Sequence, residues 1–159
     1  MKRVSVWLKA GVLALMMASS AAMATAYSEQ KVVYHINDEG QQDHVQAMRF
    51  IQNHINAVGE EKIDLKVVMH GDGLAMIMYP ESIGEVKVFK TGSADDNVQA
   101  RIDGLKDQGV QFLVCENTVT GREVDPFDHL HNVDEEDIVP SGVATLSELQ
   151  LQGYTYIRP

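Results

Sequence analysis

The chain has 159 residues, of which 45% are hydrophobic, and it carries a formal net charge of −10 with a single cysteine. So negative a surface repels phosphate backbones, which argues against nucleic acid as a partner. One cysteine cannot form an internal disulfide, so Cys115 is either a packing residue or a free reactive thiol.

The first 26 residues predict a secretory signal peptide. Three basic residues accompany a short apolar stretch at residues 10–18, and Ala24 and Ala26 offer small-residue cleavage sites, with cleavage after Ala26 expected. The apolar stretch is too short to cross a bilayer, which takes about 20 residues. An uncleaved amphipathic anchor is the alternative.

Cleavage after Ala26 would leave residues 27–159, which is the length of one ordinary domain. Ten basic residues would then face 23 acidic ones, for a net charge of about −13. Export predicts a periplasmic location and a soluble mature protein without a membrane segment. In that oxidising compartment an unpaired thiol has to be buried, protected or used.

Strand and helix patterns alternate along the first half of the remaining chain. Residues 31–36 and 63–69 are apolar runs of strand length, and residues 41–58 repeat apolar side chains every three or four positions, which predicts a helix. The stretch 85–90 alternates like a strand, but an extended loop fits it as well.

The second half continues the alternation. Its expected elements are a helix at 95–108, a strand at 110–114, a helix from 116, a strand at 137–139, a helix from 142 and a strand at 154–157. Ser141 is a good N-cap for the last helix, which Val143, Leu146, Leu149 and Leu151 help to line. Such alternation implies a mostly parallel sheet with helices on both faces.

Polar residues follow the predicted strands, and in parallel sheets reactive groups gather at those carboxyl ends. Cys115 and His70 are therefore expected on one edge of the sheet. Cys115 also precedes a helix, whose N-terminus favours the thiolate, whereas the neighbouring Glu116 opposes it. His70 is either a base or hydrogen-bond partner for the thiol, or a turn residue.

The other histidines are weaker candidates for functional residues. His35 lies inside a strand and is expected to be a satisfied core residue, whereas His44 and His54 are expected to be solvated. His129 and His131, with two aspartates nearby, are weak candidates for metal ligands, and an acidic surface loop is the alternative. No cofactor site is predicted, because the chain has no phosphate-binding glycine loop and no nucleophile elbow.

Three stretches resemble the DsrE/DsrF-like family. They are VVMHGDGL at 67–74, IDGLKDQGVQFLVCENT at 102–118, and the tail at 139–159, which contains VPSGVA and LQLQGYTYIRP. The resemblance implies a three-layer α/β/α domain with a mostly parallel five-stranded sheet, and assembly into trimers or hexamers.

Members of this family that act in sulfur metabolism carry sulfur as a persulfide on a cysteine that follows the same strand, and Cys115 matches that position. The resemblance therefore implies a sulfur carrier or sulfurtransferase that works through Cys115, with a donor or acceptor protein as partner. His70, expected on the same edge of the sheet, is a weak candidate for a helper of that cysteine. Two departures are export and the polar residues 116–118 after the cysteine. The alternative is a non-catalytic oligomeric binding module in which Cys115 is structural.

Overall fold

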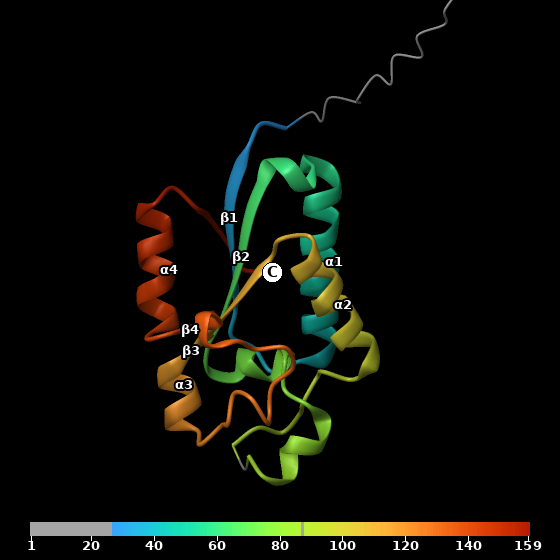
Figure 1. Cartoon of the computed structure of the whole chain (residues 1–159), viewed down its shortest axis with the longest axis vertical. Coiled ribbons are helices and arrows are strands. Elements are labelled where there is room, and N and C mark those ends of the chain that lie inside the picture. The colour runs from blue at the N-terminus through green and yellow to red at the C-terminus, as the bar shows by residue number, and fades with distance from the viewer. Residues whose placement is uncertain (1–26, 87) are drawn as a thin grey trace, which may run out of the picture.

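The computed structural model describes residues 27–86 and 88–159, so the predicted signal peptide lies outside the described residues (Figure 1). Five strands form one sheet in the order β4-β3-β2-β1-β5, and every neighbouring pair is parallel. The strands are β1 (Gln30–Ile36), β2 (Ile63–Met69), β3 (Gln111–Cys115), β4 (Ile138–Val139) and β5 (Thr155–Ile157). The predicted α/β class with a parallel five-stranded sheet is confirmed.

Helices connect the strands. They are α1 (Gln41–Val58), α2 (Asp96–Asp107), α3 (Glu116–Gly121) and α4 (Gly142–Leu151), with short 3-10 helices at Glu60–Lys62, Gly71–Met76, Pro80–Gly84 and Glu135–Asp137. The side chain of Asp95 accepts hydrogen bonds from two backbone N–H groups at the start of α2. Ser141 caps α4 as predicted, because its hydroxyl accepts from the backbone N–H of Ala144 at 3.3 Å.

The helices form layers on both sides of the sheet. Figure 1 shows α1 and α2 on one side and α4 on the other. The larger apolar core lies on the α1/α2 side, and a smaller cluster on the α4 side is made of Val33, Val68, Leu146, Leu149 and Tyr154. Because side chains alternate along a strand, His35 and Cys115 share the α4 side with Val33.

The register aligns the carboxyl ends of the strands. Ile36 of β1 pairs with Met69 of β2, and Met69 pairs with Val114 of β3. The next residue of β2 is His70 and the next residue of β3 is Cys115. Both therefore lie in the same row at the carboxyl edge of the sheet.

Both histidines of α1 correct a prediction of solvated side chains. His44 is 1% exposed, and its two ring nitrogens contact Ser93 Oγ at 2.8 Å and the carbonyl of Asp38 at 2.7 Å. His54 is half-buried and hydrogen-bonds Tyr34 Oη at 3.1 Å. The sheet and the 91–95 loop bury a wider face of α1 than the spacing of its apolar residues predicted.

Two further expectations differ from the structure. Val143 and Leu151 are 64% and 81% exposed, since the small apolar layer on this side takes only Leu146 and Leu149 from α4. Around residues 85–90 the described backbone forms turns and bends, so it is neither the strand nor the extended loop that the alternation allowed. Within the described part of the chain, the helices are too short or too polar to cross a bilayer.

Candidate functional site

The candidate site lies where the ends of β2 and β3 meet the start of α4. Gly142 is the first residue of α4, and a methyl group added at its Cα would lie 3.1 Å from His70 Cβ and 3.3 Å from Cys115 Cβ. His70 and Cys115 therefore flank the same glycine. A larger residue here would press on both side chains, because contacts of 3.1 and 3.3 Å are tighter than carbon atoms normally make.

Cys115 is the N-cap residue of α3, and its side chain lies beside Gly142 at the start of α4. The backbone N–H groups of Asn117 and Thr118, at the start of α3, and of Gly142 all act to lower the pKa of the thiol. The hydroxyl of Thr118 acts in the same direction. Cys115 itself is 5% exposed.

The orientation of the Thr118 hydroxyl follows from its second contact. The backbone N–H of Gly71 donates to Thr118 Oγ1 at 3.0 Å, so this oxygen acts as an acceptor toward the β2 side. Its single proton remains free to point at Cys115, since a hydroxyl has one donor and two acceptor positions. The residue after His70 thus fixes a donor that faces the sulfur.

The net effect of this environment is a thiol that ionises more readily than usual. Burial raises the pKa of Cys115, but the hydrogen bonds from Gly142, Thr118 and Asn117 together outweigh it, so the pKa lies below its ordinary value. Glu116, whose carboxylate was expected to oppose the thiolate, is exposed to solvent. The arrangement favours the thiolate, which is the nucleophilic form.

A second histidine lies against His70. His35 Nε2 is 2.7 Å from His70 Nε2, the two rings stack with centroids 4.7 Å apart, and His35 Nδ1 contacts Tyr156 Oη at 2.6 Å. Tyr156 comes from β5, so the chain Tyr156–His35–His70 crosses from the edge strand β5 over β1 to the end of β2. This chain ends beside Gly142 and Cys115.

Both histidines hold protons weakly. Burial lowers the pKa of His70, and burial followed by the charges of His70 and Arg158 lowers the pKa of His35, while Asp38 acts in the opposite direction. His35 is a satisfied, buried histidine as predicted, but it also belongs to the site. In the described part of the chain, the hydrogen bond of the His70 ring goes to His35 and not to the sulfur of Cys115.

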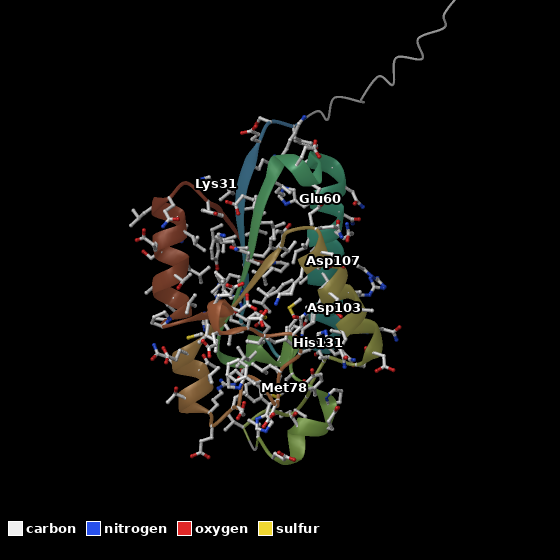
Figure 2. The ribbon with its side chains drawn as sticks, in the orientation of Figure 1. Lys31, Glu60, Met78, Asp103, Asp107 and His131 are labelled. Carbon is white, nitrogen blue, oxygen red and sulfur yellow. The ribbon has the colours of Figure 1, made fainter. Side chains whose placement is uncertain are left out.

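The loop that carries His129 and His131 lies elsewhere. His131 Nε2 is 2.8 Å from Asp103 Oδ1, and Figure 2 shows these two side chains between the loop and α2. His129 Nδ1 accepts from the backbone N–H of Asp125 at 3.0 Å. Among the described residues, no three His, Cys, Asp or Glu side chains are grouped so that they could hold a metal ion. The contacts of these histidines hold the loop in place.

Sequence reasoning missed three residues of this site, namely His35, Thr118 and Tyr156, whereas it expected Gly142 at the carboxyl edge of the sheet with His70 and Cys115. Alternation places His35 on the face of Val33, but only the register, in which His35 pairs with Val68 and Val68 with Leu113, puts it on the same face as Cys115. The role of Tyr156 depends on the position of β5 beside β1, which no local pattern contains.

Comparisons with known proteins agree with this architecture. The model of the DsrE/DsrF-like family matches residues 9–159. A solved structure described as a protein of unknown function, MTH1491 from Methanobacterium thermoautotrophicum, is 25% identical with a TM-score of 0.64, covering 82% of this chain and all of that one. The ychN protein from E. coli is 14% identical with a TM-score of 0.54, covering 84% of this chain and all of its own, and shares the fold. No curated protein matches the chain.

Proposed function

We propose that this chain, which belongs to the DsrE/DsrF-like family, carries sulfane sulfur as a persulfide on Cys115 and acts as a sulfur relay or sulfurtransferase. The observation that carries the proposal is the place of Cys115 at the carboxyl edge of the sheet, as the N-cap residue of α3 and beside the first residue of α4, together with a pKa below its ordinary value. Backbone N–H groups at the start of a helix stabilise a thiolate before the reaction and an anionic persulfide after it.

The reaction is a thiol exchange. The Cys115 thiolate attacks the outer sulfur of a donor persulfide, RS–SH, so that a new S–S bond forms on Cys115 and the bond between the two donor sulfurs breaks. The donor leaves as the thiolate RS⁻, and Cys115 holds –S–SH. One sulfur atom moves, the charge is conserved, and no outside oxidant or reductant takes part.

The low exposure of Cys115 limits the size of the sulfur donor, and it also counts in favour of a structural role for the cysteine. A side chain that is 5% exposed favours a small or slender donor, such as a hydropolysulfide or a persulfide on an extended segment. The same burial favours the alternative, in which Cys115 is structural and the protein is a non-catalytic binding module. The lowered pKa of Cys115 favours the carrier, because a thiol packed among apolar side chains has its pKa raised.

Location and assembly are further parts of the proposal. The N-terminal pattern supports export to the periplasm, and the family resemblance supports a homo-oligomer. Exposed apolar side chains such as Val143 and Leu151 on α4 supply surface of the kind that subunit contacts use. A donor or acceptor protein would complete the relay.

Intact mass spectrometry of the folded protein tests the central step. After brief treatment with inorganic polysulfide, the wild-type chain is expected to gain about 32 Da, the mass of one sulfur atom, and to lose it again on reduction with dithiothreitol. Cys115→Ser is the matched control, since it changes one atom and should gain nothing. A folded wild-type protein that never gains this mass would leave the binding module as the better account.

A further inference from the structure

Arg122 is a cation next to the candidate site whose hydrogen-bond donors are only partly used. It is the C-cap residue of α3, and its Nη1 lies 2.7 Å from Asp72 Oδ1. The N–H groups of Nη1 do not point at that oxygen, so this buried nitrogen has no hydrogen-bond acceptor among the described residues. Buried donors normally have an acceptor, which makes this one a candidate for contact with a ligand.

The guanidinium group of Arg122 lies close to the residues around Cys115. Its Nη2 is 3.8 Å from the methyl position of Gly71, the residue after His70. The N–H of Gly71 in turn donates to Thr118 Oγ1, whose hydroxyl acts on the thiol of Cys115. The guanidinium group and Thr118 therefore lie against the same glycine. Since α3 rises about 1.5 Å per residue, the backbones of Cys115 and Arg122 are on the order of 10 Å apart.

Two neighbours hold this guanidinium group in place. Its central carbon lies 4.7 Å from the centroid of the buried Phe89 ring, which covers one face of the cation. The other neighbour is Asp72, whose side chain is 52% exposed. A carboxylate so exposed is able to turn into solvent when another anion takes its place, whereas the buried ring stays. Arg122 is thus a fixed cation with an exchangeable counter-ion.

Arg158, which follows β5, is the other arginine at this edge of the sheet, and its donors are used differently. Its Nη2 donates to both carboxylate oxygens of Asp38, at 3.1 and 3.0 Å. It also lies near enough to His35, at the end of β1, to lower the pKa of that histidine. Of these two arginines, Arg122 is the one beside the cysteine that has a buried donor without an acceptor.

We infer that Arg122 binds the anionic group of the sulfur donor, and that this donor is a small persulfide whose carrier bears a carboxylate a few bonds from its sulfur. The inference rests on the proposed sulfur transfer and adds the class of its substrate. The planar fork of an arginine matches a carboxylate, which here replaces that of Asp72. Because the chain carries a formal net charge of −10 and repels anions, a local cation assists the approach of such a donor to Cys115.

Alkylation of Cys115 by two reagents of nearly equal size tests this inference without any sulfur transfer. Iodoacetate carries a carboxylate where iodoacetamide carries a neutral amide, so the ratio of their rates on the folded protein, read as intact mass, measures the attraction of an anion. Arg122→Gln is expected to lower this ratio on the order of tenfold, the size of a charge effect at short range. Asp72→Asn is expected to raise the ratio, because the competing carboxylate is gone.

Arg101→Gln is the matched control for these variants. It removes the same charge at an exposed position of α2, which covers the side of the sheet opposite Cys115, and should leave the ratio unchanged. Urea unfolding checks that each variant is folded. Should Arg122→Gln fail to fold, the rise with Asp72→Asn carries the test, and its absence overturns the inference.

Sulfur loading provides the same comparison for the reaction itself. The persulfide of 3-mercaptopropionate is expected to load wild-type Cys115 faster than the persulfide of 2-mercaptoethanol, which has no carboxylate. Arg122→Gln is expected to remove that difference, whereas Arg101→Gln keeps it. A purely structural role of the ion pair between Arg122 and Asp72 would not distinguish the two donors.

The results separate this inference from the proposed function. Equal alkylation ratios in the wild type and Arg122→Gln, or shifts in one direction for both Arg122→Gln and Asp72→Asn, would overturn the inference while persulfide formation on Cys115 stands. Opposite shifts in a protein that never gains sulfur would overturn the proposed function and leave an anion site beside a cysteine. A thiol that neither reagent reaches in the folded protein would contradict both.

Discussion

Gly73→Ala is expected to destabilise the protein by about 3 kcal/mol or more, at the upper end of what overpacking costs. Gly73 lies in the 3-10 helix that follows His70, under the end of β1. A methyl group there would be 2.1 Å from the carbonyl oxygen of Ile36 and 2.7 Å from the backbone nitrogen of Asn37. Both are backbone atoms of the sheet edge, so no side-chain rotation can relieve the contact.

Urea unfolding of the two proteins measures this effect. Gly104→Ala is the matched control, because a methyl group at Gly104 meets nothing within 4 Å and lies in the middle of α2. Alanine is a better helix former there by roughly 0.5–1 kcal/mol, so this variant is expected to be more stable than the wild type. A Gly73→Ala protein as stable as the wild type would show that β1 and the 71–76 segment are not packed as described.

Gly142→Ala is expected to slow sulfur loading of Cys115 on the order of tenfold while the fold survives, since small displacements of reacting groups have large effects on rate. The new methyl group would be 3.1 Å from His70 Cβ and 3.3 Å from Cys115 Cβ. Both atoms are fixed to the sheet edge and have to move apart by a few tenths of an ångström. Alanine keeps the backbone N–H that lowers the pKa of Cys115, so the substitution tests spacing alone.

The loading rate is measured by the time course of the mass gain after polysulfide. Gly121→Ala, at the end of α3, is the control, because a methyl group there has open space around it. The destabilisation by Gly142→Ala is expected to be about 1 kcal/mol, within reach of unfolding measurements. Loading as fast as in the wild type would mean that the approach to Cys115 does not pass Gly142.

The local patterns of the chain contain most of the fold. The apolar spacing of residues 41–58 and the strand-length run at 63–69 predict α1 and β2 at the residues where the structure has them. The N-cap role of Ser141 could be predicted from the sequence, because it depends only on the backbone three residues away. The same local reasoning misplaces Val143, Leu151 and His44, since burial is decided by how far the facing layer extends.

The candidate site also combines features that local sequence predicts with contacts between distant segments that it does not. Placing Cys115 and His70 on one edge follows from the rule for parallel strands, whatever their order in the sheet. The contact between His35 and Tyr156, 121 residues apart, follows from β5 pairing with β1. No periodicity in either segment predicts that pairing, so the chain Tyr156–His35–His70 beside the cysteine can be found only from the structure.

The pH dependence of the alkylation of native Cys115 by iodoacetamide, read as intact mass, tests the central claim most directly. The claim is that amide donors at the edge of the sheet hold a reactive thiolate. It predicts alkylation of the folded protein, with a midpoint below that of the same cysteine unfolded in urea, where the thiol pKa is about 8.5. A thiol that is alkylated only when the chain unfolds, or whose native midpoint is no lower than the unfolded one, would contradict it.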